Sequence, residues 1–166
     1  MNNDGFEIER KFLIAMPDPA VLERGERSRI VQTYLLGQPD TTERVRLRAY
    51  PDRTEYTHTV KTRLNAMRRI ENERAVSAAE YEELLTRADP ARRPIEKERC
   101  CIEENGLIWE VDIFPFWKKQ AYLEVELLDE SQPFVLPPWV TLLRDVTEDP
   151  RYTNAALAFQ IPEEEK

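Results

Sequence analysis

The stretch ERVRLRAY, from Glu43 to Tyr50, indicates the fold class because charged and apolar side chains alternate from its second residue onward. Successive side chains of a β-strand point to opposite faces, so this alternation predicts a strand with one charged and one apolar face. The charged face carries three arginines and the apolar face two aliphatic residues: Arg44, Arg46, Arg48, Val45 and Leu47. The turn sequence Pro51-Asp52-Arg53 follows and ends the strand.

The same period of two recurs along the rest of the chain. The further predicted strands cover residues 7–13, 29–36, 55–62, 69–76, 95–103, 107–114 and 121–128. Ser77-Ala78-Ala79-Glu80 is a capping box, and it opens a helix whose apolar stripe runs from Tyr81 to Ala88. Short helices are expected near residues 19–24, 138–143 and 154–159. Eight strands with short connections predict a mainly β fold with flanking helices, an antiparallel sheet closed into a barrel, because closure removes exposed sheet edges.

The length of 166 residues predicts a single domain, 1–166, with a core of about 6–159 and a frayed tail over 160–166. No apolar run approaches the roughly 20 residues that span a bilayer, and no signal peptide is recognisable, so we expect no membrane partner. Cys100 and Cys101 are adjacent, and neighbouring strand residues point apart, which makes them a poor disulfide pair. A cytoplasmic location is therefore expected.

The composition excludes several kinds of site. One histidine, His58, and two adjacent cysteines cannot supply the usual ligands of a zinc centre. Four scattered glycines leave no glycine-rich loop for a nucleotide phosphate. The formal net charge of −8 argues against a nucleic-acid partner, although a local basic cluster can still bind a small polyanion.

Most predicted strands carry charges of one sign on their polar face. The negative faces bear Glu7 and Glu9, Glu71 and Glu73, Glu110 and Asp112, and Glu124 and Glu126. The positive faces bear Arg44, Arg46 and Arg48, then Lys61, then Lys97 and Arg99. A solvated face explains any one strand, but like charges at i and i+2 lie only about 7 Å apart, and a surface built for solubility mixes signs. The whole set indicates a barrel with a polar interior, where carboxylates bind Mg²⁺ or Mn²⁺ and cations bind phosphate.

These residues resemble a known family. Glu7-Ile8-Glu9-Arg10-Lys11 is similar to the ExExK signature of the CYTH superfamily, the triphosphate tunnel metalloenzymes. The later charged pairs follow in the family's order, and the segment from Asp145 to Asn154 is similar to the family's closing segment. The resemblance covers residues 6 to about 159, and the short chain looks most like the bacterial inorganic triphosphatases.

The resemblance implies an eight-stranded tunnel that hydrolyses a small polyphosphate with the help of Mg²⁺ or Mn²⁺. The first candidates for metal ligands are Glu7, Glu9, Glu124 and Glu126. The candidates for a second metal, or for positioning basic residues, are Glu71, Glu73, Glu110 and Asp112. The residues implied to hold phosphate oxygens are Arg46, Arg48, Lys61, Lys97 and Arg99. Lys11 and Tyr34 resemble a lysine–tyrosine pair proposed to act near the attacking water.

The same fold admits other functions. A CYTH-type adenylate cyclase would need a nucleoside pocket, and a thiamine triphosphatase would need an aromatic platform, for which Trp117 or Trp139 is available. A non-catalytic module that only binds polyphosphate or metal is the alternative of a different class. A turnover assay with tripolyphosphate and Mg²⁺ separates enzyme from binder, and the appearance of cyclic AMP from ATP identifies a cyclase. The expected assembly is a monomer or a homodimer.

Overall fold

The computed structural model describes residues 6–65 and 67–165, and the side chains of Phe6 and Glu7 lie outside its described part. Within these residues, nine strands and a few short helices follow one another along the chain. The strands are β1 (Phe6–Ala15), β2 (Glu26–Tyr34), β3 (Thr41–Ala49), β4 (Thr54–Arg63), β5 (Arg68–Ala75), β6 (Ile95–Glu104), β7 (Leu107–Ile113), β8 (Gln120–Glu126) and β9 (Leu142–Asp145). The predicted strands therefore form at nearly the expected positions.

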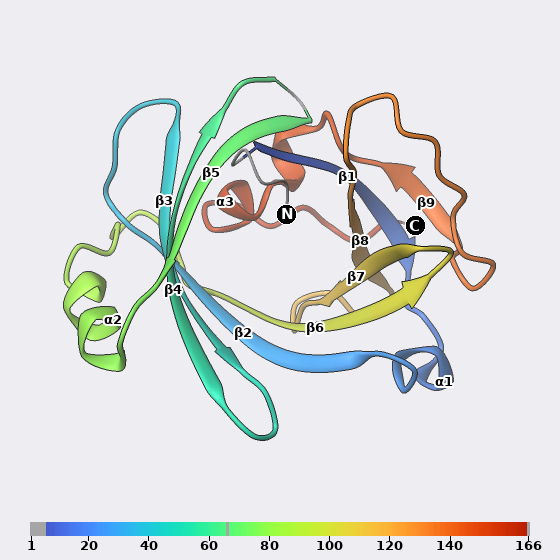
Figure 1. The fold of residues 1–166 in the computed structure, drawn as a ribbon, viewed down its shortest axis with the longest axis horizontal. Coiled ribbons are helices and arrows are strands. Elements are labelled where there is room, and N and C mark those ends of the chain that lie inside the picture. Colours follow the sequence, from blue (N-terminus) through green and yellow to red (C-terminus); the bar gives the residue numbers. More distant parts are fainter. Residues whose placement is uncertain (1–5, 66, 166) are drawn as a thin grey trace.

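Eight of the strands close into an antiparallel barrel (Figure 1). Their order around the barrel is β1-β5-β4-β3-β2-β6-β7-β8, and β8 pairs with β1 to complete the ring. β1 closes the barrel because its residues 6–8 pair with β5 and its residues 9–15 pair with β8. The prediction of a closed, mainly β fold is confirmed.

β9 is an addition that the sequence did not reveal. Residues 138–143 were expected to be helical, but this prediction is wrong, because Leu142–Asp145 form β9 and pair with residues 12–14 of β1. β5 pairs with only the first residues of β1, so the backbone groups farther along that edge need another partner. β9 supplies it, and a tertiary partner of this kind leaves no local pattern in the sequence.

The helices are short and lie outside the barrel or within one end of it. α1 (Pro19–Leu22), α3 (Asn154–Leu157) and the 3₁₀ helix η1 (Pro150–Tyr152) are each about one turn long. α2 (Ala78–Leu85) is the longer one, and the Ser77 hydroxyl caps it by accepting a hydrogen bond from the Glu80 N–H at 3.1 Å. The buried Tyr81 of α2 packs on the outer face of the sheet with Val45, so α2 covers an apolar barrel wall as expected.

Two apolar clusters stabilise the barrel from different sides. The outer cluster packs side chains such as Trp109 and Leu123 beneath the segment between β8 and β9, which contributes Phe134 and Trp139. The other cluster joins barrel residues such as Leu13 to Tyr152 and Leu157 of the C-terminal segment. Figure 1 shows α3 within the outline of the ring, and the apolar side chains of η1 and α3 pack against the inner residues of the barrel.

The last described residues run back along the barrel. The Trp117 indole N–H donates to the Pro162 carbonyl at 3.0 Å, and the Glu165 N–H donates to Gln120 Oε1 at 2.7 Å. Two residues of the tail over 160–166, Pro162 and Glu165, thus make hydrogen bonds with side chains of the barrel region. No helix in the described part of the chain is long and apolar enough to cross a membrane.

Candidate active site

The strand register places like charges opposite each other on one wall of the barrel. Glu9 of β1 lies opposite Glu126 of β8, and Glu110 of β7 lies opposite Glu124 of β8. Like charges at directly opposed positions destabilise a sheet. Burial, reinforced by the neighbouring carboxylates, raises the pKa of Glu110 and that of Glu126. Cations reduce the mutual repulsion of this wall, since Arg69 lies 2.8 Å from Glu9, Lys11 lies 3.2 Å from Glu124 and Arg99 lies 2.5 Å from Glu110.

The facing wall is basic and carries the arginines of β3. Arg46 is mostly buried, and its nearest acidic partner, Glu73, lies 3.8 Å away. Burial, together with the charges of Arg44, Arg99 and Arg48, lowers the pKa of Arg46 to about 10. Among the described residues, none accepts a hydrogen bond from the Nε atom of Arg46. A cluster of guanidinium groups that repel one another in this way favours the binding of an anion.

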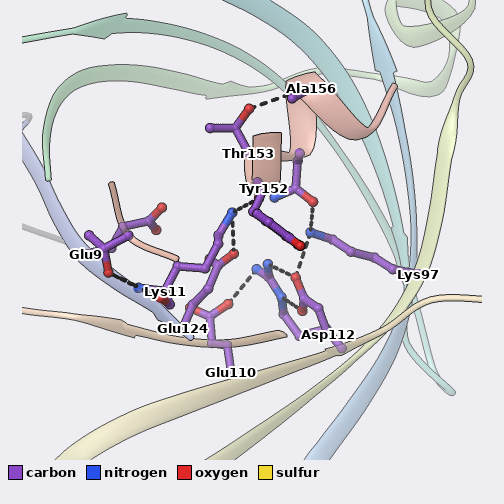
Figure 2. Close-up of polar contacts among 12 residues, drawn as sticks. Glu9, Lys11, Lys97, Glu110, Asp112, Glu124, Tyr152, Thr153 and Ala156 are labelled. Atoms are coloured by element: carbon purple, nitrogen blue, oxygen red, sulfur yellow. Dashed lines mark hydrogen bonds and ion pairs between the residues drawn. The ribbon is translucent and has the colours of Figure 1, made fainter. Parts of the chain in front are cut away.

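A fully buried network joins the basic wall to the acidic one. Asp112 accepts hydrogen bonds from Arg99 at 2.8 and 3.0 Å, and Lys97 Nζ lies 2.7 Å from its second oxygen. Although burial favours the neutral acid, Arg99 and Lys97 hold the pKa of Asp112 well below its usual range. Burial lowers the pKa of Lys97 to about 8 despite the attraction of Asp112. Both oxygens of Asp112 are thus occupied by cations (Figure 2).

This network bears on two of the residues that the resemblance singled out. One of the two roles expected of Asp112 was to position basic residues. Arg99 lies directly opposite Asp112 in the register of β6 and β7, and this arrangement fits that role. Arg99 also contacts Glu110 at 2.5 Å. The Lys97 side chain is fully buried behind the wall of the cavity described below. Lys97 therefore does not contact that cavity, although it was expected to hold phosphate directly.

Lys11 and Tyr34 line the same cavity without contacting each other. Lys11 Nζ lies 3.2 Å from Glu124, donates to the Tyr152 carbonyl at 3.2 Å and sits 4.8 Å from the centre of the Tyr122 ring. The Tyr34 hydroxyl accepts a hydrogen bond from Gln32 Nε2 at 3.4 Å. In the described part of the chain no hydrogen bond joins Lys11 to Tyr34, so they are neighbours around one space and not a bonded pair.

The cavity that these residues share has a volume of about 150 Å³. Its lining is Glu9, Lys11, Tyr34, Thr42, Arg44, Lys61, Arg63, Arg69, Thr153, Asn154 and Ala155. The sequence pattern did not assign a role to Arg63 or Arg69. Each lies two residues from a candidate on its own strand, Lys61 or Glu71, and therefore on the same face of the strand. Residues 153–155 of the C-terminal segment were also missed as site residues, and no periodic signal could have placed them inside the barrel.

The remaining candidates flank this cavity. Glu73 accepts a hydrogen bond from the buried Thr59 hydroxyl at 2.9 Å, and Glu71 lies opposite Lys61 in the register. Arg48 donates to the Ser28 hydroxyl at 2.9 Å. The carboxylates of β5 therefore stand beside cations of β3 and β4. The backbone of Glu7 pairs with that of Arg69, and its side chain lies outside the described residues.

A larger cleft of about 710 Å³ lies beside η1 and α3, and the described residues that line it all fall within 144–165. Its two arginines, Arg144 and Arg151, both lie close to Asp149, at 3.6 and 2.6 Å. Both arginines are also considerably more exposed to solvent than Arg46. The buried charged side chains of the predicted site thus lie in the barrel and not in this cleft.

The comparison with known proteins agrees with this geometry. No family model matches the chain. The inorganic triphosphatase of Nitrosomonas europaea is 38% identical over 163 residues, which cover 94% of this chain and 99% of that protein. The chain belongs to the inorganic triphosphatase family. A second inorganic triphosphatase, from Acetivibrio thermocellus, is 34% identical over 155 residues and covers 92% and 93% of the two chains.

The comparison with solved structures agrees with the assignment of the chain to the inorganic triphosphatase family. A crystal structure of an inorganic triphosphatase matches with a TM-score of 0.61 and 33% identity, covering 95% of this chain and 97% of that one. A protein of Pyrococcus horikoshii matches with a TM-score of 0.56 at 18% identity, over 75% and 80% of the chains, and shows a shared fold alone. The resemblance to the CYTH superfamily is confirmed.

Proposed function

We propose that this member of the inorganic triphosphatase family hydrolyses inorganic triphosphate inside its barrel, and that a divalent cation is required. The observation that carries the proposal is the pair of facing walls, one of carboxylates opposed in register and one of arginines that repel one another around Arg46. A complex of a polyanion with a cation relieves the repulsion on both walls. The names of the two bacterial relatives support the same substrate.

The size of the cavity favours an inorganic substrate over an organic one. Sites for drug-sized molecules usually enclose about 300–1,000 Å³, whereas this cavity encloses about 150 Å³. Tyr34 is the single aromatic residue among the described lining residues, and the rest are charged, small or hydroxylated. Apart from Tyr34, an adenine or thiazole ring would find no aromatic side chain among the described lining residues. Cyclase and thiamine triphosphatase activities are therefore not favoured.

The acidic wall suits a hard cation. The carboxylates Glu9, Glu110, Glu124 and Glu126 supply oxygen donors only, which Mg²⁺ and Mn²⁺ prefer. Among the described residues no three acidic, histidine or cysteine side chains form a ready-made metal cage. Mg²⁺ is commonly held by one or two carboxylates together with substrate phosphates, so a complete protein cage is not needed. Bound there, the cation would offset phosphate charge and increase the acidity of a coordinated water.

The chain's own residues would hold and orient the substrate. Arg44 and Lys61 line the cavity and can bind phosphate oxygens, while Arg46 and Arg48 strengthen the positive potential beside them. The Lys11 ammonium has three N–H groups; one donates to the Tyr152 carbonyl, and the ion pair with Glu124 holds a second side of the group. Its third N–H is available to a phosphate oxygen or to the attacking water, with the Tyr34 hydroxyl on the same cavity. Holding these groups in place is the main route to catalysis of phosphoryl transfer.

The test is a substrate panel with metal removal. Purified protein is first treated with EDTA and then assayed with tripolyphosphate, pyrophosphate, ATP and thiamine triphosphate, with and without Mg²⁺ or Mn²⁺. We expect hydrolysis of tripolyphosphate with the highest kcat/KM, no turnover in EDTA and no cyclic AMP from ATP. Tight binding of tripolyphosphate without turnover would identify a binding module, and full activity in EDTA would overturn the metal requirement.

A further inference from the structure

Asn154 occupies the boundary between the cavity and the buried ion-pair network. It is the first residue of α3, and with Thr153 and Ala155 it lines the cavity. Lys97 lies behind it, with a side chain that is fully buried. The Lys97 ammonium donates a hydrogen bond to Asn154 Oδ1 at 3.3 Å.

This contact settles the orientation of the Asn154 amide. An ammonium group has three donors and no acceptor, so the end of the amide that faces Lys97 must be the oxygen. The NH₂ end is consequently turned away from Lys97. Among the residues that the structure describes, none accepts a hydrogen bond from Nδ2 of Asn154. Because Asn154 lines the cavity, its two N–H donors are available to whatever binds there.

The orienting contact is itself held firmly. Lys97 Nζ lies 2.7 Å from Asp112, and Asp112 is fixed by two hydrogen bonds from Arg99. Figure 2 shows Lys97 reaching from Asp112 toward the C-terminal segment at Tyr152. Donors that are oriented in advance by a buried network need no rearrangement when the ligand arrives.

We propose that Asn154 is a substrate-binding residue that donates from Nδ2 to a phosphate oxygen of the bound triphosphate, with Lys97 as the positioning residue that orients its amide. The inference rests on the proposed function, because it assigns a further contact to the same substrate. A neutral donor has a specific advantage at this point. It binds a phosphate oxygen without adding another positive charge to the repulsion between Arg44 and its neighbours.

The decisive experiment compares Asn154→Asp with Asn154→Ala. The aspartate keeps an oxygen that accepts from Lys97, but it replaces the two donors by an anionic oxygen facing phosphate. We expect Asn154→Asp to raise KM for tripolyphosphate most, by about tenfold or more, which is the usual effect of losing a hydrogen bond to a charged group. Asn154→Ala should raise KM less, and the matched control Gln160→Ala, an exposed amide of the same segment, should behave like the wild type.

A purely structural link between α3 and Lys97 predicts the reverse order, because Asn154→Asp would preserve it. If Asn154→Asp has wild-type KM and kcat while Asn154→Ala is impaired, the assignment of a phosphate donor is overturned. Lys97→Met should raise KM in the wild type but have little further effect in the Asn154→Ala background. Should Lys97→Met fail to fold, the two Asn154 variants still decide the question.

Calorimetric titration of each variant with tripolyphosphate in EDTA separates this inference from the proposed function. A wild type that binds tripolyphosphate but does not hydrolyse it with Mg²⁺ would contradict the function and leave the Asn154 contact measurable by affinity alone. We expect the affinity to fall in the order wild type, Asn154→Ala, Asn154→Asp. Equal affinity in all three proteins would refute the contact whether or not the wild type is an enzyme.

Discussion

Replacing Asp112 by asparagine removes one negative charge from the point where Arg99 and Lys97 converge. The Asp112 and Lys97 side chains are fully buried, and that of Arg99 is 10% exposed. Breaking a buried ion pair from one side typically costs about 3–5 kcal/mol, because a charge stays buried without its partner. Arg99 keeps Glu110 at 2.5 Å, and burial already lowers the pKa of Lys97 to about 8, so that this lysine can lose its proton. Because both effects reduce the energy of the cations that lose Asp112, we expect the free energy of unfolding to fall by about 3 kcal/mol, the lower limit of that range.

A loss of this size is easily measured. For a domain of this length 1 kcal/mol changes the melting temperature by about 2–4 °C, so Asp112→Asn should melt about 6–12 °C below the wild type in EDTA. Urea unfolding followed by tryptophan fluorescence provides the free energy independently. The matched control is Glu126→Gln, which removes a carboxylate repelled by Glu110 and Glu9. That variant should be as stable as the wild type or more stable.

The alternative role of Asp112, as a ligand of a second metal, predicts a different result. A metal ligand without its metal would repel neighbouring carboxylates, so its neutralisation would leave the melting temperature in EDTA unchanged or raise it. It would also raise the Mg²⁺ concentration needed for half-maximal activity in the folded protein. If Asp112→Asn melts at the wild-type temperature in EDTA and shows this changed metal requirement, the reasoning from the ion pairs is wrong.

Three further predictions concern single residues. Arg46→Ala should lower kcat/KM for tripolyphosphate by about a hundredfold or more. The melting temperature without ligand should stay the same or rise, because the arginines of β3 repel each other. A large loss of stability with normal kcat/KM would show a structural role. Burial raises the pKa of Glu110 and Glu126, so at a pH above the ordinary carboxyl pKa the folded state binds more protons than the unfolded chain. The metal-free protein should therefore become more stable as the pH falls toward that ordinary pKa. Urea titrations at several pH values should show a smaller gain for Glu126→Gln. The pKa of Lys97 is lowered from 10.5 to about 8, so between these pH values the unfolded chain binds more protons than the folded one. The stability of the wild type should therefore rise with pH in this range. Lys97→Met should show a smaller rise.

The barrel was predictable because period-two alternation is a local property. β3 was expected over residues 43–50 and forms over Thr41–Ala49, and its arginines and aliphatic residues lie on the expected faces. β9 was not predictable from a local pattern. Its four residues form a strand because they pair with the edge of β1, which is distant in the sequence. The same holds for the place of η1 and α3, because no local pattern shows that their side chains pack against the barrel residues or that Asn154 and Ala155 line the cavity.

The roles of the charged residues were predictable only in part, because a strand pattern reveals the face of a side chain but not its cross-strand partner. Asp112 and Glu110 share one face of β7 and look equivalent in the sequence. The register separates them, since Asp112 faces Arg99 while Glu110 faces Glu124 on its other side. A one-residue shift would exchange faces, and no local signal fixes the register of these distant strands.

The contrast between paired and opposed charges explains how a barrel with so many interior ions can fold. Where the register pairs opposite signs, as at Asp112 and Arg99, the ions satisfy one another and need no ligand. Where it opposes like signs, as at Glu9 and Glu126, a cation from another strand reduces the repulsion, as Arg69 does at 2.8 Å from Glu9, and the apolar clusters beneath β8 and around Leu13 offset what remains. Such repulsion has no structural benefit, and it is relieved when counter-charges enter. The opposed positions are therefore the first at which to test for ligand binding, while the fully buried pair of Asp112 and Lys97 behind Asn154 is proposed to orient its neighbours.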